Sequence, residues 1–364
     1  MKVKIGDLTK IKTGKLDANV SSEDGKYPFF TCSKEPLKIS TYSYDCECVL
    51  VAGNGDLNVK YYNGKFDAYQ RTYIIEANGS GKLYMPYLYY FMEDYIDELR
   101  KQAIGGVIKY IKSANLTDAL IELPSVDEQK SIVEILKKVK GILDKRNDEI
   151  RELDNLIKAR FVEMFGDPRS NPYGFSKKQL KDTCKVVTGN TPSRSVEKYY
   201  GDYIEWIKTD NIVSGLLNPT KASEKLSEEG MKVGRTVGKD SILMACIAGS
   251  VTSIGRVCVT DRTVAFNQQI NAVVPVNYNI LFLYVLLQLS KEYLVGEINM
   301  ALKGILSKAK LEEKEFIVPP MELQEQFADF VKQVDKTKVA LQRSLEKVQM
   351  LFDSLMQNFF DKHE

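Results

Sequence analysis

The sequence predicts an α+β protein, with two pseudo-symmetric mixed α/β domains separated by two long antiparallel helices that form a coiled coil. Three observations support this fold class. The segment beginning at Ile121 aligns without a gap over the segment beginning at Phe316, for about 45 residues at an offset of 195. Both copies continue into a proline-free stretch whose apolar residues recur in alternating steps of four and three, the coiled-coil spacing. Each stretch follows a segment rich in strand and turn signals.

The first domain is expected at residues 1–125. Residues 48–52, 60–62 and 73–75 read as short β-strands, because they are rich in β-branched and aromatic side chains. Gly53–Asp56 and Asn63–Lys65 carry turn signals, and a helix is expected near 86–101.

The first long helix is expected at residues 126–166. Ser125 and Glu128 have the spacing of a capping box just after Pro124, and Gly166 followed by Pro168 supplies a stop signal. At about 1.5 Å rise per residue, such a helix is roughly 60 Å long.

The third segment, residues 167–320, repeats the plan of the first. Residues 5–14 match 180–189, residues 68–70 resemble 265–267, and residues 106–116 correspond to 301–311. Residues 203–207 and 241–247 read as strands, and Trp206 and Tyr203 are expected in the core.

The second long helix is expected at residues 321–364. A single amphipathic helix of this length cannot hide its apolar stripe alone, which favours an intramolecular antiparallel pair. The alternative is a coil that joins two copies of the chain. Lys338, which aligns with Leu143, and the seam residues Arg146 and Arg160 are expected to fix the register. The expected helix-pairing residues are Ile132, Leu136, Val139, Leu143, Ile150, Leu153, Ile157, Phe327, Val331, Val334, Leu341, Leu345, Val348, Phe352 and Leu355.

Composition bounds the classes of function. No apolar run of about 20 residues could span a bilayer, and the first residues lack a signal-peptide core, so a cytoplasmic protein is expected. The net charge is only +2, although residues 167–320 carry 20 basic and 16 acidic side chains. A DNA ligand would therefore require clustered basic groups or a partner that contributes phosphate contacts. The six cysteines include no Cys-x-x-Cys pair, so reduced thiols are expected rather than a metal site.

Four motifs carry a resemblance to a known family. They are residues 123–129 (Leu-Pro-Ser-Val-Asp-Glu-Gln), 318–324 (Val-Pro-Pro-Met-Glu-Leu-Gln), 161–168 and 188–193. With the tandem arrangement of globular unit and long helix, they make essentially the whole chain resemble the specificity subunit of type I DNA restriction–modification systems. The second copy departs from the pattern at Leu323, where the first has Glu128.

The resemblance implies a role without catalysis in this chain. Each globular unit would be a target recognition domain that reads one half of a bipartite, asymmetric site in double-stranded DNA. The helices would set the spacing and dock two methyltransferase subunits, and restriction subunits could join the complex. S-adenosylmethionine, ATP and Mg²⁺ would belong to these partners, which would methylate adenines or cleave unmodified DNA.

The residues also argue against an enzyme. No Gly-x4-Gly-Lys-Ser/Thr phosphate loop is present, and the only histidine is His363. Asn171-Pro172-Tyr173 lacks the second proline of an adenine methyltransferase motif. Two alternatives stay open: a self-sufficient DNA nuclease or methyltransferase, and a coiled-coil adaptor that does not bind DNA.

Candidate DNA-reading residues are polar side chains beside turns. Arg and Lys suit guanine, Asn and Gln suit adenine, and lysines at the ends of the domains suit phosphates. For each of them the rival interpretation is turn chemistry, solvation or, for Gln70, Asn267, Gln268 and Gln269, a buried amide. The candidates are Lys12, Thr13, Lys15, Ser33, Lys34, Asn54, Tyr69, Gln70, Arg71, Lys109, Tyr110 and Lys112 in the first domain, and Thr188, Asn190, Thr191, Ser193, Arg194, Lys208, Asn211, Ser253, Arg256, Asn267, Gln268, Gln269, Lys303, Ser307 and Lys308 in the second.

Overall fold

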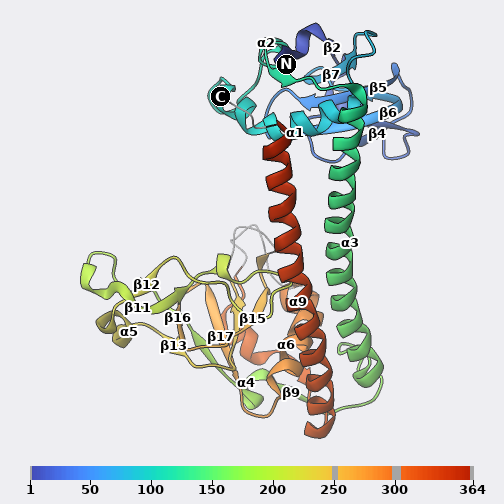
Figure 1. The fold of residues 1–364 in the computed structure, drawn as a ribbon. Helices are drawn as coiled ribbons and strands as arrows, with labels where there is room; N and C mark the ends of the chain where they lie inside the picture. Colours follow the sequence, from blue (N-terminus) through green and yellow to red (C-terminus); the bar gives the residue numbers. More distant parts are fainter. Residues whose placement is uncertain (1, 248–252, 297–304, 361–364) are drawn as a thin grey trace. The chain divides into compact units, whose positions relative to one another are not determined.

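The computed structural model describes residues 2–247, 253–296 and 305–360. The chain forms two compact units, one made of Met1–Asn147 with Ser344–Glu364 and the other of Asp148–Arg343. The long helices α3 (Val126–Phe165) and α9 (Met321–Phe360) each pass from one unit into the other (Figure 1). Each unit therefore contains one globular domain and one half of both helices.

The first unit is built on one six-stranded sheet with the order β2-β7-β5-β6-β3-β4. Side chains alternate along β5, so that Val49 and Val51 pack with helix α1 while Cys48 and Leu50 face the opposite core. The elements are β1 (Lys2–Lys4), β2 (Thr9–Thr13), β3 (Tyr27–Phe30), β4 (Leu37–Ile39), β5 (Tyr44–Ala52), β6 (Val59–Ala68), β7 (Thr72–Ala77), α1 (Met85–Gln102), α2 (Ser113–Thr117) and β8 (Leu120–Glu122).

The second unit repeats this plan with most of its strands divided between two four-stranded sheets, β10-β17-β14-β15 and β12-β11-β16-β13, while β9 pairs with β18. The expected repeat at 301–311, including Lys303, lies partly outside the described residues. The elements are β9 (Lys177–Gln179), α4 (Leu180–Thr183), β10 (Cys184–Thr188), β11 (Tyr200–Ile207), β12 (Lys225–Leu226), α5 (Glu228–Val233), β13 (Thr236–Val237), β14 (Ile242–Ala245), β15 (Val257–Val259), β16 (Val264–Phe266), β17 (Ile270–Pro275), α6 (Ile280–Leu289), α7 (Lys291–Val295), α8 (Lys308–Glu313) and β18 (Glu315–Ile317).

Two local predictions are wrong. The turn expected at Asn63–Lys65 is the middle of β6, where Gly64 lies opposite Cys46 at a φ of 137° that glycine adopts without strain. Tyr203 is 61 % exposed rather than in the core. The pairing of β11 with β12 shifts register between Tyr200 and Ile204, and this irregularity turns Tyr203 outward. Trp206, beyond the shift, is buried as expected.

The predicted capping box opens α3. The Ser125 backbone N–H donates to Glu128 Oε2 at 2.9 Å, and the Glu128 N–H donates to Ser125 Oγ at 3.3 Å. At the other end, Gly166 takes a φ of 72° directly after the last helical residue. Both ends of the helix thus follow from the residues that flank it.

A buried glutamine fixes the start of each long helix to its own domain. Gln129 Oε1 accepts from the backbone N–H of Tyr84, which precedes α1, at 2.8 Å, and its Nε2 donates to the Pro124 carbonyl at 3.0 Å. Gln324 repeats these contacts 195 residues later, accepting from the N–H of Asn279 before α6 at 2.9 Å and donating to the Pro319 carbonyl at 2.8 Å. The Pro-x4-Gln motif is therefore a clamp between two helices.

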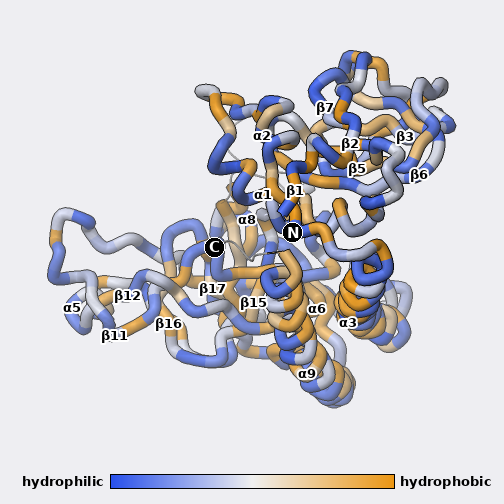
Figure 2. The backbone as a smooth tube through the Cα atoms, turned by 45° about the horizontal axis from the view of Figure 1, so that its top comes forward, coloured by the Kyte–Doolittle hydropathy of each residue, from blue (hydrophilic) through white to orange (hydrophobic). Residues whose placement is uncertain are grey.

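The long helices run antiparallel within each unit, as predicted. In the first unit Val133 and Leu136, near the start of α3, share a core with Met356 and Phe360 at the end of α9. In the second unit, residues 157–165 of α3 share a core with residues 327–334 of α9. Apolar positions recur among polar ones along both helices (Figure 2). The intramolecular pair is thus confirmed over a coil between two copies.

The expected helix-pairing residues differ in burial. Those near the second domain are mostly buried, whereas those in the middle of the helices and on α9 near the first domain are mostly half-buried. Buried are Leu136, Val139, Leu143, Ile157, Phe327, Val331 and Val334, and half-buried are Ile132, Ile150, Leu153, Leu341, Leu345, Val348, Phe352 and Leu355.

An ion pair joins the helices in the second unit. Lys338 Nζ on α9 lies 2.5 Å from Asp154 Oδ1 on α3 and donates to the Gly215 carbonyl at 3.1 Å. The Lys338 side chain is only 10 % exposed, and that of Asp154 is 33 % exposed. Arg160, also expected at the seam, instead pairs with Glu163 on its own helix at 2.8 Å.

We expect Gln324→Ala to lower the free energy of unfolding by about 2 kcal/mol, since it leaves a buried N–H and a buried carbonyl without their partner. The exposed Gln326 on the same helix provides the matched control, and Gln326→Ala should change stability by less than about 0.5 kcal/mol. Denaturant unfolding measures both. Equal effects of the two substitutions would show that the clamp does not stabilise the domain.

We expect Asp154→Ala to destabilise the second unit by roughly 2 kcal/mol, because it removes the ion-pair partner of Lys338 in a nearly buried site. Adding Lys338→Leu should recover most of the lost stability, because the leucine side chain has no charge to desolvate. Asp329→Ala, which breaks an exposed pair with Lys332, is the control. The ion pair has no such role if the double variant is as unstable as the single one in thermal unfolding.

Candidate nucleic-acid interface

Most first-domain candidates meet at one edge of the sheet. This edge, termed the loop edge, comprises residues 13–16 after β2, 53–55 after β5, 69–71 between β6 and β7, and 109–112 between α1 and α2. Backbone hydrogen bonds join the four segments. The Gly14 N–H donates to the Thr72 carbonyl at 3.0 Å, and the Gly53 N–H to the Arg71 carbonyl at 2.8 Å. The Ile111 N–H in turn donates to the Gly53 carbonyl at 2.9 Å.

The second domain forms the same edge with the same hydrogen bonds. The Gly189 N–H donates to the Ile270 carbonyl at 3.0 Å, and the Cys246 N–H to the Gln269 carbonyl at 2.8 Å. The Leu306 N–H donates to the Cys246 carbonyl at 2.9 Å. Each bond has a counterpart in the first unit, so the loop edge exists twice in one chain.

These bonds correct the internal alignment by one residue. The sequence comparison placed 68–70 on 265–267, whereas the shared hydrogen bonds place 68–70 on 266–268. Gln70 therefore corresponds to Gln268 rather than to Asn267. Both glutamines are exposed at the tip of the turn that enters the equivalent strands β7 and β17.

The glycines before these turns are required by close packing. A Cβ on Gly14 would lie 2.2 Å from the Ala68 carbonyl oxygen, and one on Gly189 would lie 2.1 Å from the Asn267 carbonyl oxygen. Any larger residue would push the turn away from its neighbouring loop. The Thr-Gly of both repeats thus holds the turn that presents Gln70 or Gln268.

The other first-domain candidates occupy several environments. Lys15, Gln70, Arg71, Lys109, Tyr110 and Lys112 are exposed on the loop edge, and Asn54 and Tyr69 are half-buried there. Thr13 is exposed at the end of β2. Lys12 is ion-paired with Glu76 and lies 4.9 Å from the Tyr44 ring centroid. Ser33 and Lys34 follow β3, whose last residue, Phe30, accepts from the Tyr69 N–H of the loop edge at 2.9 Å. Lys34 faces an acidic pocket described below.

Many second-domain candidates use their side chains in hydrogen bonds that hold the loops around them. Asn190 donates to the Val233 carbonyl and accepts from the Arg235 N–H, and the amide of Asn211 bonds Thr220 and Lys221. Asn267 is 6 % exposed and bonds Gln269, so for Asn267 the buried-amide interpretation holds. Thr188 bonds Asn271, Thr191 bonds Gln268, Ser193 bonds Ser195, Arg256 bonds the carbonyls of Ser253 and Thr209, Ser307 caps α8, and Lys308 pairs with Glu312.

Glu224, which sequence reasoning missed, organises two of the candidate cations. Both oxygens of Glu224 accept from the Arg194 guanidinium, at 3.1 and 2.9 Å, and Lys208 Nζ lies 2.5 Å from Oε2. The guanidinium also lies 4.6 Å from the Tyr200 ring centroid and 5.1 Å from that of Trp206. These hydrogen bonds, first from Arg194 and then from Lys208, lower the pKa of Glu224 to about 2. No signal in the sequence places Glu224 next to residues 16 to 30 positions away.

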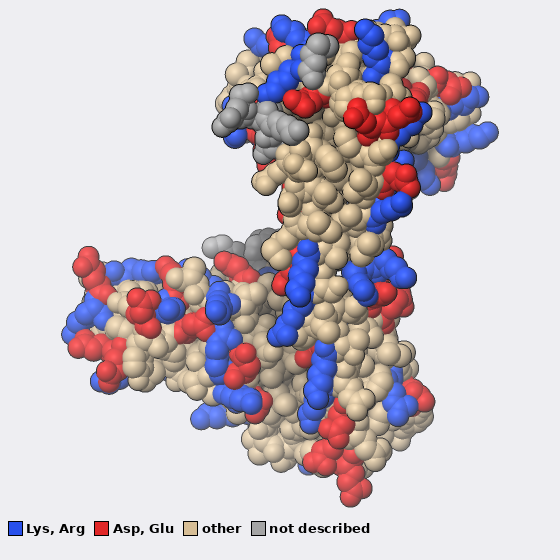
Figure 3. All heavy atoms as spheres, in the orientation of Figure 1, with Lys and Arg blue, Asp and Glu red and all other residues tan. Residues whose placement is uncertain are grey.

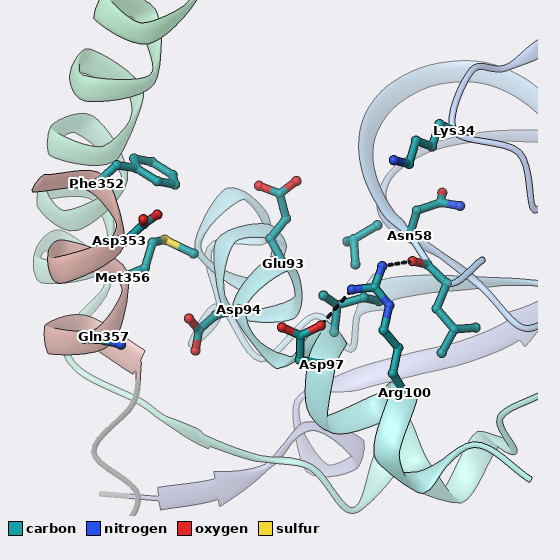
Figure 4. A pocket seen from close by; sticks show the side chains of 13 residues that line it. Lys34, Asn58, Glu93, Asp94, Asp97, Arg100, Phe352, Asp353, Met356 and Gln357 are labelled. Atoms are coloured by element: carbon teal, nitrogen blue, oxygen red, sulfur yellow. Dashed lines mark hydrogen bonds and ion pairs between the residues drawn. The ribbon is translucent and has the colours of Figure 1, made fainter. Parts of the chain in front are cut away.

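A pocket in the first unit has the wrong charge for DNA. A cavity of about 530 Å³ lies between α1 and the end of α9. It is lined by the carboxylates of Glu93, Asp94, Asp97 and Asp353, whose positions Figure 4 shows. Arg100 pairs with Asp97 at 2.7 Å, so one of the few cations there is already neutralised. Repulsion from phosphates excludes this pocket as part of a nucleic-acid interface.

Charges of both signs are interspersed on the molecular surface. On the face drawn in Figure 3, Lys and Arg side chains lie among Asp and Glu side chains in both units. Within the described ranges, no three His, Cys, Asp or Glu side chains gather closely enough to hold a metal ion. The helices of the described part of the chain are also too short or too polar to cross a membrane.

The comparisons with known proteins agree on one family. The model of the type I restriction modification DNA specificity domain matches residues 1–153 and 172–349. The EcoDI specificity subunit of a type I restriction enzyme from Escherichia coli is 37% identical over 156 residues, which cover 43% of this chain and 34% of that protein. The HindI specificity subunit of Haemophilus influenzae is 30% identical over 135 residues, 36% of this chain and 28% of that protein. This chain thus aligns with about a third of the length of these two relatives.

A more distant relative and two solved structures align over more of the chain. The MjaIX specificity subunit of Methanocaldococcus jannaschii is 24% identical over 74% of this chain and 67% of that protein. The crystal structure of a type I restriction-modification S subunit from M. genitalium covers 99% of this chain and 96% of its own, with a TM-score of 0.63 at 16% identity. A chain from a type I R-M complex covers 100% of this chain and 96% of its own, with a TM-score of 0.56 at 16% identity. These similarities show a shared fold.

We expect Glu224→Gln to destabilise the second unit at neutral pH and to leave it unaffected at strongly acidic pH. A carboxylate whose pKa is lowered on folding stabilises the folded state above its unfolded pKa of about 4.3. That contribution is lost as the pH falls from there toward about 2. Unfolding midpoints between pH 7 and pH 2 test this, with Glu197→Gln as the control. A difference that stays constant over this range would contradict the assignment.

Proposed function

Because the chain belongs to the type I restriction–modification DNA specificity family, we propose that it selects the DNA sequence on which partner enzymes act. Each domain reads one half of a bipartite, asymmetric site in double-stranded DNA. Two methyltransferase subunits bind the chain and methylate adenines at that site. Restriction subunits that join the complex cleave DNA in which the site is unmodified. The chemistry and its S-adenosylmethionine, ATP and Mg²⁺ belong to these partners.

The duplicated loop edge is the observation that supports this proposal. One chain presents the same hydrogen-bonded turns twice, with different side chains around them. Exposed Lys15, Arg71 and Lys112 surround the first edge. Such groups suit phosphates and guanine, and the exposed Gln70 and Gln268 suit adenine. Two edges with different side chains read two different half-sites, which makes the site asymmetric.

The paired helices set the distance between the half-sites and dock the methyltransferases. A helix of 40 residues is about 60 Å long, which is somewhat less than two turns of B-DNA at about 34 Å each. Both helices also expose apolar side chains, which is the composition of a protein-binding surface. They are Ile135, Ile142, Leu156 and Val162 on α3, and Met321, Val339, Met350 and Leu351 on α9.

The two alternatives make different predictions. A self-sufficient nuclease or methyltransferase would act on DNA when purified alone with Mg²⁺ or S-adenosylmethionine. A coiled-coil adaptor would show no duplex affinity that falls with salt, whereas phosphate contacts make affinity fall steeply. The duplicated edge with exposed cations and amides favours DNA recognition over the adaptor.

Methylation sequencing of cells that carry the chain and its methyltransferase should reveal one split motif, which disappears when the chain is deleted. We expect Gln70→Ala to relax or abolish methylation through the first half-site only, and Gln268→Ala through the second only. A bidentate amide–adenine contact discriminates by about 1–3 kcal/mol, so methylation should fall roughly 5- to 100-fold.

Asn63→Ala, on an exposed position of β6, is the matched control and should leave the motif intact. The assignment of the glutamines fails if either substitution acts equally on both halves or on neither. The proposed function itself fails if no split motif depends on the chain.

A further inference from the structure

The connection between α1 and α2 in the first unit carries an exposed apolar tip. Val107 is 104% exposed, and Ile108 is 63% exposed. Ile104 and Tyr110, which flank the tip, are 45% and 38% exposed. These adjacent β-branched side chains at the end of a loop are mostly exposed to water, and their hydration is unfavourable. Such a patch, set among polar residues, is typical of a binding surface.

The base of this loop is held in place by hydrogen bonds. The Ile104 N–H donates to the Tyr110 carbonyl at 3.0 Å, and the Tyr110 N–H donates back to the Ile104 carbonyl at 2.8 Å. Gly105 has a φ of 122°, and a Cβ there would lie 2.6 Å from the Ile108 carbonyl oxygen. Only glycine fits this position. The loop therefore presents Val107 and Ile108 from a defined hairpin.

The loop is also part of the loop edge. The Gly55 N–H donates to the Lys109 carbonyl at 3.0 Å, and the Ile111 N–H donates to the Gly53 carbonyl. Gly53 in turn bonds Arg71, which is exposed beside Gln70. The apolar tip is thus continuous with the surface assigned to DNA.

The charges around the tip identify what it binds. Lys109 directly follows the apolar pair, and Lys112 lies three residues further on, just before α2; both are exposed. A DNA duplex has phosphates on its outside and stacked bases on its inside. An apolar tip with cations at its base is complementary to it, because the cations can contact phosphates while the tip contacts the bases. Proteins that kink DNA insert such apolar side chains between base pairs while cations contact the adjacent phosphates.

Building on the proposed function, we propose that Val107 and Ile108 form a wedge that enters the first half-site between two neighbouring base pairs. The wedge unstacks one step, and Lys109 and Lys112 contact the phosphates next to it. A pyrimidine–purine step suits this role, because such steps unstack most easily. Recognition of the first half-site then depends on how easily one base step deforms, as well as on contacts with the edges of the bases.

The test uses the complex of the full chain with its methyltransferase subunits. Each duplex contains the motif that the complex methylates, with 2-aminopurine placed at a different position of the first half-site. With the native chain, binding should raise the fluorescence of 2-aminopurine at a single base step that does not include the adenine to be methylated. The Val107→Thr/Ile108→Thr variant keeps β-branched residues in the loop and should lose this rise. Its Kd should increase about 10- to 100-fold. The signal at the methylated adenine, which a methyltransferase extrudes, should remain.

Salt dependence separates the wedge from phosphate contacts. The Val107→Thr/Ile108→Thr variant should weaken binding with no change in the slope of log Kd against log salt. Lys109→Gln/Lys112→Gln should instead make the slope shallower, by about 0.9 for each phosphate that the variant no longer neutralises. Leu120→Thr is the matched control for the apolar change. Leu120 is 48% exposed on β8 opposite Lys4, and the five residues of β2 separate that end from the loop edge.

The outcomes distinguish the inference from its premise. If the threonine variant retains both the fluorescence rise and the affinity, as Leu120→Thr should, the wedge is refuted. If it binds fewer methyltransferase subunits than the control, the tip docks a protein and the wedge is likewise refuted. If the native complex binds no split motif, the proposed function itself fails. Circular dichroism of both variants verifies that the fold is intact.

Discussion

The buried glutamine at the start of each long helix is the contact on which both domains depend. Gln129 and Gln324 are almost fully buried, and each satisfies a backbone N–H at the start of a domain helix and a proline carbonyl before the long helix. A buried amide in such a place is costly unless its bonds are made. The side chain therefore fixes the angle at which the long helix leaves its domain. Because the loop edge belongs to that domain, the same contact orients the proposed reading surface.

The repeat preserves this geometry while the charges around it have diverged. Lys140 on α3 donates to the Tyr89 hydroxyl at 3.0 Å and lies 3.4 Å from Glu93, both on α1. At the same places 195 residues on, Asp335 lines a pocket with Tyr284 and Gln288 of α6, and burial raises the pKa of Asp335. If the start of α9 packed on α1 of the first domain in the place of α3, the Asp335 carboxylate would face the Glu93 carboxylate. Such repulsion favours the correct pairing of each helix with its domain.

The sequence predicts well what depends on local pattern and poorly what depends on pairing. The capping box at Ser125, the glycine stop and the long amphipathic helices follow from residues close in sequence. The Asn63–Gly64 turn, the buried Tyr203 and the alignment of Gln70 with Asn267 were wrong because strand register decided them. A one-residue shift changes which side chain reaches the tip of a turn. Only the cross-strand hydrogen bonds reveal that Gln70 and Gln268 are equivalent.

Charge sets the remaining constraint on how such a chain can hold DNA. The net charge of the chain is only +2, and residues 167–320 carry only a small excess of basic side chains, 20 against 16 acidic. Within that domain, Arg194 and Lys208 are both bound to Glu224, which would weaken non-specific attraction to phosphates. Affinity must then come from contacts that need the correct sequence, or from the partner subunits. A specificity subunit benefits from this arrangement, because attraction to any duplex would hold it on sites that lack the motif. Under the proposed function, Glu224 would therefore act against indiscriminate binding. The rings of Tyr200 and Trp206 would keep the Arg194 guanidinium in place for a DNA site that displaces Glu224.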